Sequence, residues 1–399
     1  MRYLSLLALL AATPALLGQQ PAFQEEQFHG RRAFVLENGL MRVSTLPGGG
    51  FIGEIRLLSP DPRKSVNPLR VPHYQTIDPF RYEAATHGEL YGTGIQRRLM
   101  SGYMGHFLCF PQYGPTSAAE LNFDLGQHGE ALAVEWKRQK VESGPQGVTL
   151  RYSAELPKNQ YRIERAITLA PGETVGYVEE SIENLTPYDR PVNWVQHITF
   201  GPPFLAPGRT YADAPVTRVL LADGTKLHEG DWPEITDPQG LRVNQRRFIE
   251  TPNSGRYTAW LLDRSRPKVW FTLYNPDYPV LIGYIFPAES NPWIGDWQEN
   301  QRVTAIPWNG KAIARGIDIG TTPFAEGLRR SVDRGSVLGV PTFRWIEARE
   351  RQTQRYLFFL AEIPSGYKGT ADVKVEGGKI VIVEQQSERT IAINSSREW

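Results

Sequence analysis

Several side chains in the sequence could carry out acid–base chemistry. His197 lies in an apolar stretch that ends at Phe200, and Asp318 lies in the middle of the stretch 314–323. Aspartate is disfavoured inside strands, so its presence there favours a site carboxylate over a structural ion pair. An imidazole and a carboxylate with pKa values near the working pH can move protons between substrate oxygens. The alternative is that His197 is a satisfied core histidine, which is common in apolar surroundings.

Other candidates stand out by residue type and setting. His128 lies in a loop beside Gly129, where it could bind a ligand or cap a turn. Glu299 is a reserve carboxylate in the stretch 295–300, with a solvated loop acid as the alternative. Cys109 lies among aromatic and aliphatic neighbours, so we interpret it as a small buried hydrophobe and not as a nucleophile.

Strands must position these residues, because period-two patterns and turn signals dominate the sequence. Residues 161–169 alternate with period two, and Asn38-Gly39 separates two apolar runs, which is the strongest short hairpin signal. No segment combines a 3.6-residue apolar stripe with helix caps. The pattern predicts a mostly-β protein, a large antiparallel sandwich or barrel with few helices and with long loops that could carry a site.

Composition limits the function classes. The 399 residues include 44 Lys plus Arg and 43 Asp plus Glu, which gives a net charge of +1. That balance argues against a nucleic-acid partner, which normally selects a basic stripe. The length slightly exceeds one compact core. We therefore expect one large β domain at residues 31–347 and a C-terminal β extension at 348–399, packed on the sandwich.

The N-terminus and the cysteine content point to a cellular compartment. Arg2 precedes an apolar run over residues 3–17, a secretory signal pattern too short for a spanning helix. A membrane anchor or a buried helix is the alternative. Cys109 is the only cysteine, so an intramolecular disulfide is impossible. We expect a signal peptide at residues 1–20, no integral membrane segment after its cleavage, and a periplasmic or secreted protein.

One region is more specific than the composition. Residues 105–115 read GHFLCFPQYGP, and QHGEA follows at 127–131. Downstream, RAITL at 165–169 leads to EESIEN at 179–184 and WVQHITF at 194–200. This order resembles the aldose 1-epimerase (galactose mutarotase-like) superfamily, most closely its hexose-6-phosphate mutarotase branch. The resemblance covers roughly residues 33–347 and implies a large antiparallel β-sandwich, the galactose mutarotase-like supersandwich.

The resemblance also implies a reaction and roles for particular residues. Mutarotation opens and recloses a sugar ring by proton transfer, with no metal and no cofactor. His197 matches the family's catalytic acid, and Asp318 stands where the family has a glutamate base. His128 would bind the substrate or stabilise charge on the ring oxygen. Five further residues are candidates for substrate binding, with burial in the core as the alternative for the tryptophans: His106, which stands where the family has a proline, Gln112, Trp194, Glu299 and Trp308.

Departures from the family pattern bear on the substrate. The phosphate-sugar branch has two arginines where this chain has Tyr103-Met104 and Leu132. Arginine suits phosphate because its planar fork donates paired, charge-assisted hydrogen bonds. We therefore expect a free sugar or oligosaccharide as partner. Alternatives remain open: a non-catalytic carbohydrate-binding protein, favoured by the shorter Asp318, or a role in polysaccharide modification. The sequence leaves the sugar and the oligomeric state open.

Overall fold

The computed structural model describes residues 21–223 and 226–397. The signal peptide expected at residues 1–20 lies outside the described residues. Among those that are described, no helix combines the length and the apolar character of a membrane span.

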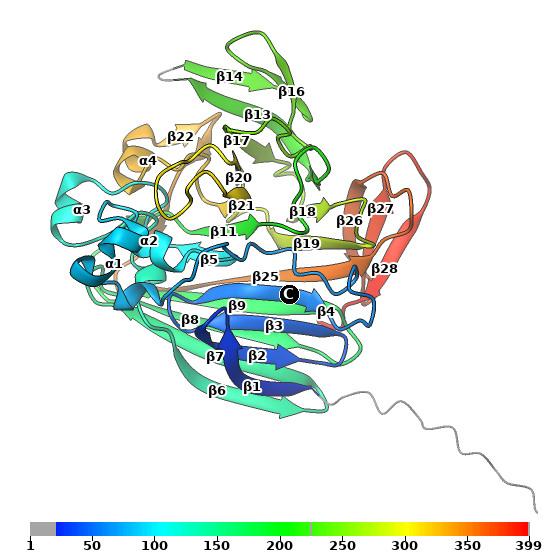
Figure 1. Ribbon diagram of the computed structural model, residues 1–399, viewed down its shortest axis with the longest axis horizontal. Helices are drawn as coiled ribbons and strands as arrows, with labels where there is room; N and C mark the ends of the chain where they lie inside the picture. The colour runs from blue at the N-terminus through cyan, green and yellow to red at the C-terminus, as the bar shows by residue number, and fades with distance from the viewer. Residues whose placement is uncertain (1–20, 224–225, 398–399) are drawn as a thin grey trace, which may run out of the picture.

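Two large antiparallel sheets stacked face to face form the body of the molecule (Figure 1). In spatial order, the eleven-stranded sheet consists of β1 (Ala22–Phe28), β2 (Arg31–Glu37), β3 (Met41–Leu46), β4 (Phe51–Leu57), β5 (His106–Cys109), β11 (Val195–Phe200), β21 (Ile313–Gly320), β20 (Trp293–Asn300), β17 (Ser254–Leu262), β13 (Val216–Asp223) and β14 (Lys226–Gly230). The eight-stranded sheet consists of β12 (Tyr211–Asp213), β18 (Lys268–Tyr274), β19 (Val280–Pro287), β25 (Arg351–Glu362), β9 (Val175–Asn184), β8 (Tyr161–Leu169), β7 (Gly147–Leu156) and β6 (Lys137–Gly144). The predicted mostly-β sandwich is confirmed.

Local sequence signals account for these strands. The period-two stretch 161–169 is β8, and the Asn38-Gly39 turn joins β2 to β3. Gly39 adopts φ 85°, a left-handed conformation that glycine takes without a Cβ clash. The Asn38 side-chain oxygen accepts the backbone N–H of Met41 at 2.9 Å, which closes the turn.

The main core lies between the two sheets. Ile198 and Ile317 face it from the eleven-stranded sheet, and Ile167, Tyr284 and Phe358 face it from the other sheet; all five are buried. Alternation along each strand sends every second side chain of β11 and β21 to the opposite face. Those outward positions are free to build a site.

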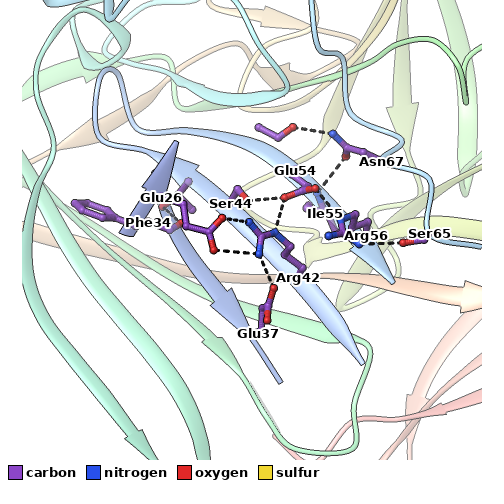
Figure 2. A network of polar contacts seen from close by, with 12 residues as sticks. Glu26, Phe34, Glu37, Arg42, Ser44, Glu54, Ile55, Arg56, Ser65 and Asn67 are labelled. Carbon is purple, nitrogen blue, oxygen red and sulfur yellow. Dashed lines mark hydrogen bonds and ion pairs between the residues drawn. The ribbon is translucent and has the colours of Figure 1, made fainter. Parts of the chain in front are cut away.

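The N-terminal meander carries a network of charges on its outer face. Figure 2 shows Arg42 of β3 in contact with Glu26, Glu37 and Glu54. Ser44 also donates to Glu54, at 2.6 Å. These contacts link the four neighbouring strands β1, β2, β3 and β4 to one another, so they stabilise the sheet.

Short elements cover the sheets' ends. The helices are η1 (Pro79–Arg81), α1 (Ala84–Tyr91), α2 (Arg97–Gly102), α3 (Ala118–Asn122), η2 (Ala131–Ala133) and α4 (Leu328–Arg334). The paired short strands are β10 (Arg190–Val192) with β24 (Arg344–Ile346), β15 (Glu234–Thr236) with β16 (Arg242–Asn244), and β22 (Ser336–Val337) with β23 (Val340–Pro341). Figure 1 shows α1, α2 and α3 grouped at one end of the sandwich.

The expected boundary at residue 347 does not separate the last strands from the two large sheets. β25 pairs with both β19 and β9, so it is an interior strand of the eight-stranded sheet. What lies outside both large sheets is the three-stranded sheet of β26 (Thr370–Glu376), β27 (Lys379–Glu384) and β28 (Thr390–Asn394). Its Ile380 and Ile382 pack with Trp270, Leu357 and Phe359 on the outer face of the eight-stranded sheet.

Candidate active site

A cavity of about 230 Å³ opens on the outer face of the eleven-stranded sheet. Its floor consists of outward-facing side chains of β11, β21 and β20, and α2 and the loop after β20 line its walls. His197 and Asp318 are direct cross-strand partners in the antiparallel pairing of β11 with β21. Directly opposed residues point to the same face of a sheet, so both side chains reach this cavity.

His197 is held in one orientation by stacking and by a hydrogen bond. Its ring stacks on Phe107, with centroids 4.5 Å apart and planes 18° apart. Its Nδ1 lies 3.0 Å from the hydroxyl of Thr199, which in turn lies 2.9 Å from the hydroxyl of Tyr103. Tyr103 is buried, and Thr199 is the acceptor within its reach, so the tyrosine donates to the threonine. The threonine hydroxyl then donates to Nδ1, which leaves the proton of the neutral imidazole on Nε2.

Asp318 is buried beside this imidazole. Its Oδ2 accepts a hydrogen bond of 2.5 Å from the Tyr113 hydroxyl, whereas its Oδ1 has no hydrogen bond among the described residues. Oδ1 nevertheless lies 3.1 Å from His197 Nδ1. Because Nδ1 presents a lone pair in the neutral tautomer, this contact becomes an ion pair only when a proton moves from the carboxyl to the imidazole.

Burial shifts both groups toward their uncharged forms. Desolvation raises the pKa of Asp318 well above its usual value, and the Tyr113 hydrogen bond opposes this rise. Desolvation lowers the pKa of His197 well below its usual value, and the neighbouring His128 adds to the effect. The two groups interact closely enough to titrate as a pair. Both shifts favour the state in which the pair holds a single proton.

His128 lies on the other side of His197, with ring centroids 5.2 Å apart. Its Nδ1 accepts the backbone N–H of Gly114 at 3.2 Å, so its proton is on Nε2. The side-chain amide of Gln127 lies 3.0 Å from Nε2, and because two donors cannot pair, the amide turns its oxygen toward this proton. Burial lowers the pKa of His128 to about 3. His128 is thus a neutral hydrogen-bond donor at the cavity wall, and a loop conformation with φ 64° positions it there.

Aromatic side chains and one carboxylate complete the wall. Trp297 and Trp308 line the cavity with ring centroids 5.7 Å apart. The indole Nε1 of Trp308 is buried and has no hydrogen-bond partner among the described residues. Glu299 accepts the backbone N–H of Val303 at 2.8 Å and lies 3.4 Å from Arg302, and so fixes the start of the loop that covers the cavity. Such a wall offers apolar faces with a few polar groups, as small-ligand sites do.

The structure brings together five of the eight site residues expected from the sequence. His197, Asp318, His128, Glu299 and Trp308 all line the cavity.

The other three expected site residues lie elsewhere. His106 is buried between the sheets, 2.9 Å from the Gln196 side chain, because it precedes Phe107 on β5 and so faces the other way. Trp194 is in the main core, and its Nε1 donates to Glu180 at 2.7 Å. Gln112 donates to the backbone oxygen of Gly126 at 3.2 Å. These three side chains do not line the cavity.

Sequence reasoning missed two tyrosines. Tyr113 donates to Asp318, and Tyr257 lies beside it, with hydroxyl oxygens 3.4 Å apart. Gly295 makes this arrangement possible, because a Cβ there would lie 2.3 Å from the Tyr257 hydroxyl. Tyr113 lies within the stretch 105–115 that carries the resemblance, so a signal for it was present; no local signal marked Tyr257.

The positions of the missing phosphate-binding arginines are filled by buried groups. Tyr103, Met104 and Leu132 are all buried. One arginine among the described residues, Arg302, lines the cavity at its mouth, with a side chain that is 55% exposed. The described lining of the cavity therefore has a cation at its rim but no buried arginine fork.

Comparison with solved structures identifies the architecture. A galactose mutarotase-like protein from Clostridium acetobutylicum superposes with a TM-score of 0.59 at 12% identity, over 86% of this chain and 99% of that one. The chain has the galactose mutarotase-like fold. A candidate aldose 1-epimerase from Klebsiella pneumoniae gives 0.59 at 14% identity, over 86% and 84% of the two chains. One from Escherichia coli gives 0.54 at 14% identity, over 83% and 99%. No family model matches the sequence, and no curated protein matches it.

Proposed function

We propose that the protein is a carbohydrate-active isomerase that interconverts the anomers of a free sugar, as an aldose 1-epimerase does. The observation that carries the proposal is the contact between His197 and Asp318, side by side in a cavity that also holds His128. An imidazole and a carboxylate at one ligand-sized cavity are what this proton-transfer reaction requires. The fold shared with candidate aldose 1-epimerases supports the same assignment.

The proposed reaction is a closed proton cycle. In the ion-pair form, Asp318 takes the proton of the anomeric hydroxyl, and His197 gives its Nε2 proton to the ring oxygen as the bond between that oxygen and C1 breaks. The open-chain aldehyde then faces a protonated Asp318 and a neutral His197. After rotation about the C1–C2 bond, the reverse transfers close the ring on the other face and restore the ion pair. His128 donates its Nε2 proton as a hydrogen bond that stabilises charge on the ring oxygen.

The proposed substrate is a free hexose or oligosaccharide rather than a hexose phosphate. The support is the apolar filling at Tyr103, Met104 and Leu132. Arg302 is the residue that could oppose this choice of substrate, because its exposed guanidinium at the rim is able to bind a phosphate. Calorimetry should give tighter binding for glucose than for glucose 6-phosphate; the opposite order would overturn the choice of substrate.

Polarimetry of freshly dissolved α-glucose and α-galactose tests the reaction itself. The wild-type protein should speed the approach to anomeric equilibrium, and His197→Gln should remove most of that rate. His87→Gln is the matched control, since His87 lies on α1 and does not line the cavity. A wild-type rate equal to buffer would refute the enzyme.

A non-catalytic carbohydrate-binding protein is the second candidate. It is favoured by the burial of Asp318, which is 1% exposed and already bonded to Tyr113. Sugar binding without any rate above buffer would establish it. Export to the periplasm or the medium is also part of the proposal and is supported by the sequence of residues 1–20. The mass of the protein recovered from the producing cells would test it, since cleavage shortens the chain at its N-terminus.

A further inference from the structure

A second hollow lies where the eight-stranded sheet meets the loops that flank β20 and β21, away from the cavity at His197. β19 pairs with β25 only as far as Ile285 opposite Leu357, so β25 continues toward Arg351 without that neighbour. The space left between the two strands is a groove of about 820 Å³. Pro287 and Ser290 line it on one side, and Thr353 and Gln354 line it on the other. The described lining residues of the groove and of the cavity are all different.

Two polar side chains in this groove lack hydrogen-bond partners among the described residues. Gln354 is 5% exposed, and its Nε2 is buried without a hydrogen bond among the described residues. A buried amide donor left unsatisfied costs on the order of 1–3 kcal/mol, so native proteins rarely keep one without a reason. Arg344 lines the same groove, and no hydrogen bond or ion pair is formed by its guanidinium within the described residues.

Arg344 is nevertheless held in place. Its guanidinium lies 5.3 Å from the ring centroid of Trp194, which is itself fixed in the core. The side-chain amide of Gln352 donates to the backbone oxygen of Trp345 at 3.0 Å and so holds β24 beside the start of β25. A fixed guanidinium with free N–H groups is prepared for a planar, bidentate acceptor such as a carboxylate.

The charges around Arg344 also favour an anion. The described lining residues include four cations, Arg264, Lys268, Arg344 and Arg355, and two anions, Glu179 and Glu289. Arg355 and Glu179 neutralise one another at 2.7 Å. Glu289 in the lining and Glu350 outside it both oppose the charge of Arg344, and the described lining still holds two more cations than anions.

One aromatic ring lines the groove, and a second ring outside the lining packs against it. Phe343 lines it and packs edge to face against Trp345, with centroids 5.6 Å apart. Trp345 is 53% exposed. An exposed tryptophan beside polar donors gives an apolar surface on which a sugar ring can lie.

We propose that this groove is a second binding site, which takes a carboxylate-bearing saccharide with its acid group on Arg344 and Gln354. The ligand's carboxylate accepts from the guanidinium and from the Gln354 amide, and a neighbouring sugar ring covers Phe343 and Trp345. This site is independent of the reaction proposed at His197, so either can fail without the other.

Calorimetry with trigalacturonic acid and with maltotriose tests the proposal. The acidic trisaccharide should bind the wild-type protein, and the neutral one should bind this groove at least about tenfold more weakly. Arg344→Gln should weaken trigalacturonate binding about tenfold or more, and Arg344→Lys, which keeps the charge but not the fork, should lie between. Arg63→Gln is the matched control, because Arg63 is an exposed arginine that does not line the groove.

A background of His197→Ala separates the two sites. Trigalacturonate binding should persist in that variant, because the groove does not use His197. Thermal melting of each variant shows whether it is folded. The proposal is overturned if folded Arg344→Gln binds trigalacturonate as tightly as wild type, if maltotriose competes equally, or if His197→Ala abolishes the binding.

Discussion

The two faces of β11 carry buried polar clusters that differ in how completely their groups are paired. On the inner face, Glu180 accepts hydrogen bonds from Arg165 at 2.8 Å, from Trp194 at 2.7 Å and from Gln196 at 2.7 Å. Three donors thus converge on one carboxylate between the sheets. On the outer face, only Oδ2 of Asp318 has a donor, and Oδ1 has none among the described residues.

Burial alone therefore does not separate a structural cluster from a functional one. Glu180 and Asp318 are both essentially inaccessible to solvent. What differs is that Asp318 lies beside a cavity with unused hydrogen-bonding capacity around it, including the indole N–H of Trp308. Unsatisfied groups cost stability and are retained where a ligand completes them. The comparison predicts that changes on the outer face affect activity and changes on the inner face affect stability.

Asp318→Asn should give the largest effect on activity. The amide keeps the side chain's shape but cannot take the anomeric proton, so the anomer interconversion rate should fall about 10²–10⁴-fold, with less effect on sugar binding. Polarimetry measures the rate, and calorimetry measures the binding. Asp277→Asn, at an exposed surface ion pair, is the control. Full activity in Asp318→Asn would remove Asp318 as the base and make Glu299 the next residue to change.

The same variant should not lose stability at neutral pH. Burial raises the folded-state pKa of Asp318, so its carboxyl stabilises the fold below the unfolded pKa, and that stability is lost as the pH rises through the folded pKa. An asparagine has no such loss. The Tm of Asp318→Asn should therefore equal or exceed that of the wild-type protein at pH 7, with the difference shrinking toward pH 4.

Glu180→Gln, on the inner face, should lower stability and leave activity nearly unchanged, in contrast to Asp318→Asn. It leaves the buried Arg165 guanidinium without its charge partner, and breaking a buried pair in this way costs about 3–5 kcal/mol. Urea denaturation should show this loss in the free energy of unfolding, while the anomer interconversion rate per folded molecule stays close to wild type. A fully stable variant that has lost its activity would contradict the division between the two faces.

Tyr113→Phe should move the pH profile. The proposed reaction needs a single proton on the His197–Asp318 pair, so activity falls at low pH when both are protonated and at high pH when neither is. The Tyr113 hydrogen bond lowers the pKa of Asp318, so its removal should shift the high-pH limb upward. The low-pH limb, which follows His197, should stay below its usual pKa of 6.5. A limb that shifts downward would show that Tyr113 does not stabilise the carboxylate.

Much of the fold could be predicted from the sequence, because its signals are local. Alternation over residues 161–169 fixes β8, and the Asn38-Gly39 turn fixes the first hairpin. The position of β25 could not be predicted this way. Its place between β9 and β19 depends on pairing with strands that are distant along the chain.

The candidate site was predictable where the resemblance named a residue and the strand register agreed. His197 and Asp318 meet because β11 and β21 pair with those two residues opposed. His106 is one position away from a residue that faces the cavity side of the sheet, and a one-residue step along a strand reverses the face. Tyr257 comes from β17 and reaches the cavity past the glycine at position 295, a close approach that a sequence pattern does not reveal.

Trp308→Phe should give the smallest effect, and it tests the difference between the two faces most directly. Phenylalanine keeps an aromatic ring at the cavity wall but removes the buried N–H that has no partner among the described residues. If that N–H donates to a sugar hydroxyl, its loss removes about 0.5–1.5 kcal/mol of binding, which is roughly a two- to tenfold rise in Kd or KM. The rate constant at saturating sugar should change little, because the group takes no part in proton transfer.

Stability should stay level or rise in Trp308→Phe, since an unsatisfied donor disappears from the free protein. A group on the inner face would show the reverse, with lost stability and unchanged sugar binding. Unchanged KM together with a lower Tm would therefore assign the Trp308 indole to packing and leave His128 as the neutral donor of the cavity wall.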